Sequence, residues 1–202
     1  MGRGHWDAVW HDRHADQVTW FQAEPAVSLR MIRSVAGPHD SIIDVGGGAS
    51  RLVDHLLAAG YDDVTVLDIA AASMEASRHR LGPHEEHVRW IVADVTAVEF
   101  DRTFDVWHDR AVFHFLIDAT DRARYLAKMN AAVRIGGHAV LSTFGPDGPE
   151  QCSGLPVRRY STELMQETLG AGFELIDDEV EQHTAPGGAV QQFVYGLFRR
   201  LS

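Results

Sequence analysis

The run Asp44-Val45-Gly46-Gly47-Gly48-Ala49-Ser50 is the segment of this chain best suited to hold a ligand. It stands between a short apolar run (41–47) and a segment with leucines and valines at helical spacing (50–59). Glycines at such a junction let the backbone approach a ligand closely, and the following helix offers its N-terminal amides. Three glycines can also simply form a turn, so the loop alone does not define a site.

Two further carboxylates follow the loop at positions that suit a nucleoside. Asp68 ends the next apolar run, 20 residues after Gly48, where an acidic side chain can bind both hydroxyls of a ribose. Asp94 ends the run after that. Because parallel strands end at one edge of a sheet, we expect Asp44, Asp68 and Asp94 at one site. A carboxylate beside a pyrophosphate is unfavourable, so an adenosine with a cationic tail fits better than a dinucleotide.

The elements that must position these residues alternate along the chain. Strands are predicted at 41–47, 63–68, 88–94, 104–109 and 138–144, and helices at 50–59, 71–81 and 121–134. The pair Gly136-Gly137 is expected to close the last of these helices. Strands separated by helices imply right-handed crossovers and a parallel sheet covered on both faces.

The C-terminal segments break this alternation. Residues 173–184 and 189–200 both have strand character, and only the short turn APGGA lies between them. A connection that short cannot hold a crossover, so the two strands must form an antiparallel hairpin. The predicted fold is α/β: a Rossmann-like, doubly wound, mostly parallel seven-stranded sheet that ends in an antiparallel β-hairpin.

The composition limits the classes of function. A length of 202 residues with 45% hydrophobic residues suits one domain with one sizeable core. The formal charge of −11 repels phosphate backbones, and no stretch is long enough to span a membrane, so neither nucleic acid nor membrane is an expected partner. Cys152 is the single cysteine, which excludes an internal disulfide and favours a reducing cytoplasm. His11 and His14 have helical spacing but no evident further ligands, so no metal site is expected.

The acidic-Gly-x-Gly loop, the acidic strand ends, the Gly136-Gly137 turn and the antiparallel last strand together resemble the class I S-adenosylmethionine-dependent methyltransferases. The resemblance runs from about residue 5 to residue 200, although Ile135 stands where the family usually has proline. It implies S-adenosyl-L-methionine as cofactor and S-adenosyl-L-homocysteine as product. The implied cofactor contacts are Asp44, Gly46, Gly47, Gly48 and Ser50 in the loop, Asp68 and Ile69 at the ribose, Asp94 and Val95 at the adenine, and Trp20.

An aromatic segment precedes the first predicted strand and contains Trp6, Trp10, Trp20 and Phe21. These rings either pack a helix onto the sheet or form a lid over the cofactor, where an aromatic face attracts a sulfonium by roughly 0.5–2 kcal/mol. The segment is similar to small methyltransferases related to those that modify lysines on elongation factors and citrate synthase, and less so to the thiopurine methyltransferases. We therefore expect one domain over 1–202, with 1–36 as an N-terminal helical lid.

The fourth predicted strand is followed by Asp109-Arg110-Ala111-Val112-Phe113-His114. The lysine-modifying subgroup has Asp-Lys-Gly-Thr-x-Asp here, so His114 replaces the carboxylate thought to face the substrate amine. Histidine can take a proton from a target lysine but does not attract its ammonium form. This difference favours a small neutral or anionic nucleophile, with His108, Asp109 and His114 as candidate general bases.

The long connection 145–160 follows the fifth predicted strand at the ligand edge, and we expect it to be a substrate loop. The candidate substrate contacts are Arg110, Cys152, Arg158, Arg159, Tyr160 and His183, although a solvated Pro/Gly loop is the simpler interpretation. The expected activity is methyl transfer by in-line displacement to a small molecule. The alternatives are a protein-lysine methyltransferase, a nicotinamide-dependent reductase, which Arg51 in place of the third glycine of G-x-G-x-x-G disfavours, and a non-catalytic nucleoside-binding module. The oligomeric state stays open.

Overall fold

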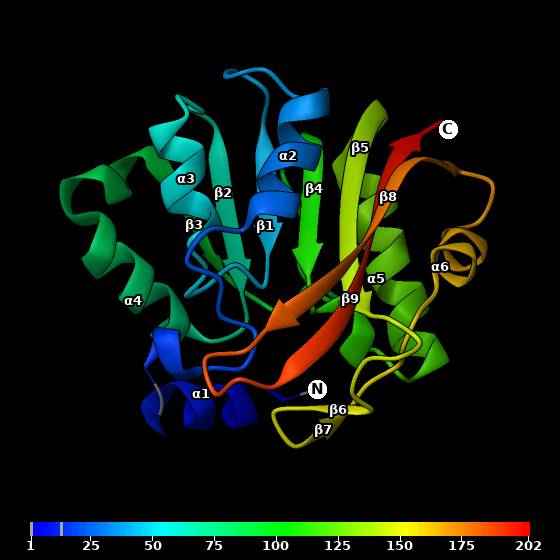
Figure 1. Ribbon diagram of the computed structural model, residues 1–202. Coiled ribbons are helices and arrows are strands. Elements are labelled where there is room, and N and C mark those ends of the chain that lie inside the picture. The colour runs from blue at the N-terminus through cyan, green and yellow to red at the C-terminus, as the bar shows by residue number, and fades with distance from the viewer. Residues whose placement is uncertain (1, 13) are drawn as a thin grey trace.

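The computed structural model describes residues 2–12 and 14–202. A seven-stranded sheet of order β3-β2-β1-β4-β5-β9-β8 forms its centre (Figure 1). The first five strands are mutually parallel, and β9 is antiparallel to both of its neighbours. These strands are β1 (Ile42–Val45), β2 (Val64–Asp68), β3 (Val88–Val92), β4 (Phe104–Arg110), β5 (Val133–Phe144), β8 (Phe173–Thr184) and β9 (Val190–Arg200). The predicted fold class is confirmed.

Helices cover both faces of the sheet because the inner strands are apolar on both sides. Ile42 of β1 and Val106 of β4 pack on one side, together with helices α2 (Ala26–Val35), α3 (Leu52–Ala58) and α4 (Ala71–Leu81). Ile43 and Trp107, the next residues of the same two strands, pack on the other side with α5 (Ala119–Ala132) and α6 (Thr162–Leu169). The two cores hold the strand ends, and therefore the glycine loop between β1 and α3, in fixed positions.

The boundary between α5 and β5 differs from the sequence prediction. The helix ends at Ala132, and β5 begins at Val133, so Gly136 and Gly137 lie inside the strand and do not close the helix. Gly136 has a φ of +77°, and a Cβ on Gly137 would lie 2.9 Å from the carbonyl oxygen of Asp105. The pair therefore allows the irregular register at which Phe104 faces Val133 but Val106 faces His138.

The C-terminal hairpin is formed as predicted. Strand β8 pairs with β9 along its whole length, from Phe173 opposite Arg200 to Thr184 opposite Val190. Because β9 is antiparallel to β5 and to β8, β8 runs in the same direction as the central strands. Its last residues therefore reach the same edge of the sheet as the glycine loop.

Short elements gather at the carboxyl ends of the strands. The N-terminal helix α1 (Arg3–Asp12) lies below these ends in Figure 1, and the small β6–β7 hairpin (Gln151–Cys152 and Leu155–Pro156) lies at the same side. Three 3₁₀ turns complete the described chain: η1 (Ala15–Gln17), η2 (Gly82–His87) and η3 (Phe113–Phe115). Of the helices described, none has the length and apolar character needed to cross a membrane.

Candidate active site

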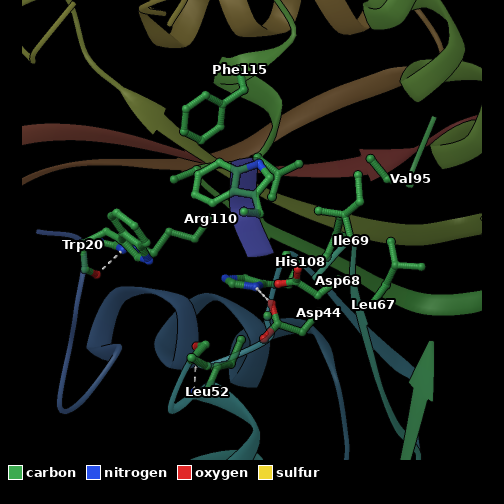
Figure 2. A pocket seen from close by; sticks show the side chains of 18 of the residues that line it. Trp20, Asp44, Leu52, Leu67, Asp68, Ile69, Val95, His108, Arg110 and Phe115 are labelled. Atoms are coloured by element: carbon green, nitrogen blue, oxygen red, sulfur yellow. Dashed lines mark hydrogen bonds and ion pairs between the residues drawn. The ribbon is translucent and has the colours of Figure 1, made fainter. Parts of the chain in front are cut away.

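A cavity of about 280 Å³ lies at the carboxyl ends of β1 to β4 (Figure 2). Its wall consists of the glycine loop, the strand ends, the turn after β4 and the segment that contains α1 and η1. Open parallel sheets bind their ligands in this position. The residues predicted from the sequence that the structure brings into this wall are Trp20, Asp44, Gly46, Gly47, Ser50, Asp68, Ile69, Asp94, Val95, His108, Arg110 and Cys152.

The glycine loop is packed so closely that side chains do not fit on it. A Cβ on Gly46, whose φ is +71°, would overlap Val112 of the turn after β4. A Cβ on Gly47 would overlap the carboxylate of Asp44, and one on Gly48 would overlap Ser73 of α4. Gly48 lies behind the wall and not in it. The three glycines thus let the loop rest directly on the neighbouring elements, and Gly46 and Gly47 line the cavity.

Asp68 ends β2 and is held by the loop. Its Oδ2 accepts a hydrogen bond from the N–H of Gly48 at 3.0 Å, and its Oδ1 accepts one from the N–H of Ala70 at 2.8 Å. Burial raises the pKa of Asp68 to about 6, against the opposing effect of these two bonds. At neutral pH the carboxylate is therefore ionised, oriented and able to accept further hydrogen bonds from hydroxyl groups.

Asp94 follows β3 and caps the turn after it. Its Oδ1 accepts hydrogen bonds from the Thr96 N–H at 2.8 Å and from the Thr96 hydroxyl at 2.7 Å. Val95 lies next to it in the wall, and Ile69 lines the cavity from the end of β2. Two apolar side chains and one fixed carboxylate make a site suited to a flat polar ring.

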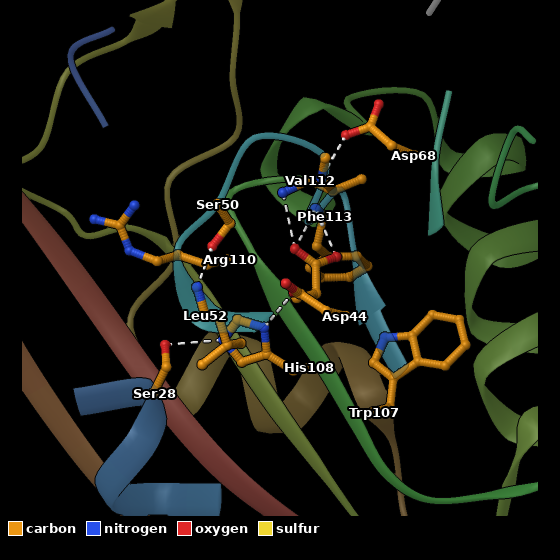
Figure 3. A network of polar contacts seen from close by, with 12 residues as sticks. Ser28, Asp44, Ser50, Leu52, Asp68, Trp107, His108, Arg110, Val112 and Phe113 are labelled. Atoms are coloured by element: carbon orange, nitrogen blue, oxygen red, sulfur yellow. Dashed lines mark hydrogen bonds and ion pairs between the residues drawn. The ribbon is translucent and has the colours of Figure 1, made fainter. Parts of the chain in front are cut away.

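His108 links Asp44 to helix α2 (Figure 3). Its Nδ1 lies 2.7 Å from Asp44 Oδ1, and its Nε2 lies 2.8 Å from the hydroxyl of Ser28. A carboxylate that accepts hydrogen bonds is matched here by the Nδ1 of the ring, and the Ser28 hydroxyl lies within hydrogen-bond distance of Nε2. The order Ser-His-Asp is that of a hydrolytic triad, but Ser28 has no exposed surface. Since both nitrogens are engaged, His108 is not a free base.

Asp109 and His114, the other two predicted bases, lie outside the cavity wall. The carboxylate of Asp109 accepts hydrogen bonds from the Val112 N–H at 2.8 Å, from the Phe113 N–H at 3.1 Å and from the hydroxyl of Tyr125 at 2.6 Å. Burial raises its pKa to about 6. These bonds turn the side chain away from the cavity and fix the turn after β4.

His114 is also engaged within the core. Its Nδ1 accepts a hydrogen bond from the N–H of Phe144 at 3.3 Å, and its ring stacks near Phe115 and Phe144. Burial lowers the pKa of His114 to about 3, so the ring is neutral at physiological pH. The position that suggested a base in the sequence is therefore buried behind the wall.

The predicted substrate loop contributes less than expected. Only Cys152 of its candidate contacts lies in the cavity wall, and burial raises the pKa of its thiol to about 12. Arg159 turns back to the Gly148 carbonyl at 3.2 Å, and Tyr160 is fully buried in the core beside α5 and α6. Arg158 lies with its guanidinium 5.1 Å from the centre of the Tyr160 ring. None of these three reaches the cavity.

His183 is placed at the expected edge, yet it acts on the chain itself. Its Nε2 lies 2.8 Å from the carbonyl oxygen of Thr19. Nearby, the amide of Gln22 donates to Glu181 at 2.7 Å. The end of β8 thus ties down the segment that follows η1.

Arg110 holds the same segment from the end of β4. Its Nη1 donates to the carbonyl oxygen of Trp20 at 2.8 Å, and its Nε donates to the hydroxyl of Tyr195 at 2.8 Å. The guanidinium carbon lies 4.2 Å from the centre of the Phe193 ring. Arg110 is therefore a rigid positive charge in the cavity wall that also anchors Trp20.

Several wall residues were not singled out by sequence reasoning. Phe115 and Ser28 line the cavity, and so does Arg51, whose guanidinium lies 5.9 Å from the Phe21 ring. Arg51 could have been found, because it directly follows the glycine loop. Ser28 has no signal in the sequence, since its role depends on the contact between α2 and β4.

The fold and this cavity define a Rossmann-like protein with a nucleoside-type site at the edge of its sheet. A family described as a methyltransferase domain matches residues 42–137, which include the glycine loop, Asp68, Asp94 and the turn after β4. This match covers just under half of the chain, and over it the chain is similar to the class I S-adenosylmethionine-dependent methyltransferases.

Relatives of the chain are distant. Over 140 residues it is 22% identical to the eEF1A lysine and N-terminal methyltransferase of Mus musculus, covering 66% of this chain and 20% of that protein. Over 123 residues it is 22% identical to nodulation protein S of Rhizobium tropici, covering 61% of this chain and 51% of that protein. The chain thus spans about a fifth of the length of the mouse protein and about half of the length of nodulation protein S.

Among solved structures, the 1,6-didemethyltoxoflavin-N1-methyltransferase of Burkholderia thailandensis, with its substrate and S-adenosylhomocysteine bound, is similar with a TM-score of 0.76. The sequence identity is 21%, and the match covers 99% of this chain and 87% of that one. At this identity the likeness shows a shared fold.

Proposed function

We propose that this protein transfers a methyl group from S-adenosyl-L-methionine to a small-molecule nucleophile and releases S-adenosyl-L-homocysteine. The observation that carries the proposal is the cavity in which the bare glycine loop, Asp44, Asp68 and Asp94 share one wall. The mouse relative and the structural neighbour are both methyltransferases by name, and the small-molecule substrate of the neighbour supports the proposal further.

The residues present fit this cofactor. Gly46 and Gly47 of the loop line the cavity, and Oδ2 of Asp44 is a buried oxygen with no hydrogen-bond partner among the described residues. Asp68 would accept hydrogen bonds from ribose hydroxyls, and Asp94 with Val95 would bind the adenine. The loop and Ser50 would face the methionine part, where Arg51 would offer a positive charge to its carboxylate.

The bound cofactor would supply a methyl group on a positively charged sulfur. The protein's own contribution is to exclude water and to hold the nucleophile about 3 Å from the methyl carbon, in line with the bond that breaks. None of the three predicted bases offers a free proton acceptor to the cavity, because His108 is fully hydrogen bonded and Asp109 and His114 lie outside the wall. This arrangement favours acceptors that are nucleophilic without help from an enzyme base.

We infer that residues 1–202 form one catalytic domain, with residues 1–36 as its lid. We also infer that the protein is cytoplasmic and binds neither nucleic acid nor membranes, which its composition and net charge support. A protein lysine is the second candidate acceptor, and the similarity to the mouse eEF1A lysine and N-terminal methyltransferase favours it.

The test is ligand-induced thermal stabilisation. At about 100 times its dissociation constant, a ligand adds about 2.7 kcal/mol to the free energy of unfolding, which raises Tm by about 5–10 °C for a chain of this size. We expect this shift with about 1 mM S-adenosylmethionine or S-adenosylhomocysteine, a concentration that saturates a site with a micromolar dissociation constant. We expect no shift with NADH. Asp68→Ala should abolish it, whereas Glu86→Ala, an exposed carboxylate outside the cavity, should not. Absence of a shift in the unaltered protein contradicts the proposal.

A further inference from the structure

The wall of the cavity is divided by chemistry into two parts. Its carboxylates, Asp44, Asp68, Asp94 and Asp121, come from the ends of β1, β2 and β3 and from the start of α5. The other part of the wall comes from three segments: helix α1, the segment that follows η1, and the turn η3. It contains the rings of Trp6, Trp10, Trp20 and Phe115, which we call the aromatic wall. No described side chain of these three segments brings a carboxylate into the cavity wall.

The aromatic wall is one connected set of rings. Trp6 meets Phe115 edge to face with ring centres 5.2 Å apart, and it meets Trp20 in the same way at 6.2 Å. Trp10 meets Trp20 at 6.1 Å and 90°. The three tryptophans are half-buried and line the cavity. Such rings gain free energy when another flat ring covers them, by about 0.5–1.5 kcal/mol per pair beyond burial.

The charge beside the aromatic wall is positive. Arg110 has a side chain only 10% exposed, and its Nη2 has no hydrogen-bond partner within the described chain. The nearest carboxylate, Glu181, lies 3.8 Å away and outside the cavity wall, where it also accepts a hydrogen bond from Tyr195. The thiol of Cys152 is neutral. An ammonium group placed beside Arg110 meets a fixed like charge, and none of the four rings of the aromatic wall offers it a carboxylate.

We propose that the methyl acceptor is a planar, conjugated small molecule, uncharged or anionic, that binds against the aromatic wall beside Arg110. The inference rests on the proposed function and names its substrate class. In the transfer, a lone pair of the acceptor atom forms the bond to the methyl carbon while the carbon–sulfur bond breaks and its electrons stay on sulfur. Any proton on the acceptor atom is released to water. This agrees with the finding that none of the candidate bases His108, Asp109 and His114 offers a free proton acceptor to the cavity. A lysine ammonium does not fit this site.

The experiment measures probe binding by calorimetry at pH 7.5 with the protein saturated with S-adenosylhomocysteine. The probes are 2-naphthol, 2-naphthoate, 2-naphthylmethylammonium and the non-planar anion cyclohexanecarboxylate. We expect the naphthol and the naphthoate to bind at least about tenfold more tightly than the other two (about 1.4 kcal/mol). Equal affinity for the ammonium probe, or for the non-planar anion, overturns the proposal.

Two variants locate the probe site. Trp10→Leu should weaken 2-naphthol binding by about fivefold or more, since one edge-to-face partner is lost. Trp90→Leu, in β3 and outside the cavity wall, should leave it unchanged. Far-UV circular dichroism spectra that match the unaltered protein show that both variants are folded. If Trp10→Leu leaves naphthol binding unchanged, the aromatic wall is not the acceptor site, whereas failure of S-adenosylhomocysteine to bind the unaltered protein overturns the proposed function and this inference together.

Discussion

Around Asp44, each buried polar side chain depends on the next one. The carboxylate lies under the glycine loop, has almost no exposed surface, and accepts one side-chain hydrogen bond, from His108. His108 is itself oriented by Ser28 on the far side. A buried carboxylate that loses its partner keeps its desolvation cost without compensation, so this chain of three residues should act as a unit.

His108→Leu tests that dependence. Because it leaves Asp44 unpaired, we expect it to lower the free energy of unfolding by about 3 kcal/mol or more, measured by urea denaturation. Ser28→Ala removes a neutral hydrogen bond and should cost about 1 kcal/mol. The double variant Asp44→Asn/His108→Leu should be more stable than the sum of the single effects predicts. Strict additivity of the two substitutions argues against a coupled unit.

The turn after β4 is the element on which the site depends most. Ala111 has a φ of +73°, which is costly for a residue with a side chain, and its N–H donates to the carbonyl oxygen of Ser142 at 2.9 Å. Asp109 holds the following two N–H groups, and Val112 presses against Gly46. The strained conformation of this turn is therefore held by the packing of Val112 on the glycine loop and by the hydrogen bonds to Asp109.

Ala111→Gly should relieve this strain. We expect the free energy of unfolding to rise by about 0.5–1 kcal/mol, because glycine adopts a positive φ without the steric cost. The matched control is Ala127→Gly, an exposed position within α5, which should lower it by about 1 kcal/mol. If both substitutions destabilise the protein equally, the positive φ of Ala111 carries no strain.

The elements were largely predictable, and the side-chain directions were not. Apolar runs identified the strands, and the short APGGA turn required the hairpin, because both depend on local patterns. The end of α5 was placed too late, since Gly136-Gly137 has the composition of a helix cap but forms a strand irregularity. Asp44, Asp68 and Asp94 lie together in the cavity wall, as expected, because the ends of parallel strands share one edge of the sheet. Asp109 and His114 were not, because hydrogen bonds to Tyr125 and Phe144 turn them into the core.

The charge of the whole molecule bears on ligand choice. The formal net charge is −11, and four carboxylates line the cavity. S-adenosylmethionine has one net positive charge, whereas S-adenosylhomocysteine has none, so the field of the protein favours the substrate form over the product.

Salt should reveal this preference. Raising sodium chloride from about 0.02 M to about 0.5 M shortens the screening length from about 20 Å to about 4 Å. We expect the dissociation constant of S-adenosylmethionine to rise over this range while that of S-adenosylhomocysteine changes little, both measured by calorimetry. Equal salt dependence of the two ligands would mean that the overall charge has no part in binding.

The hydrogen bond between Thr19 and His183 joins residues 164 positions apart, and the bond between Gln22 and Glu181 spans 159. A ribosome therefore releases the tryptophan-bearing segment long before the strand that fastens it has been made. Until then, Arg110 of β4 can already bind the carbonyl oxygen of Trp20, but the two contacts from β8 are missing. The aromatic cover of the site can therefore reach its final set of contacts only after β8 has been synthesised.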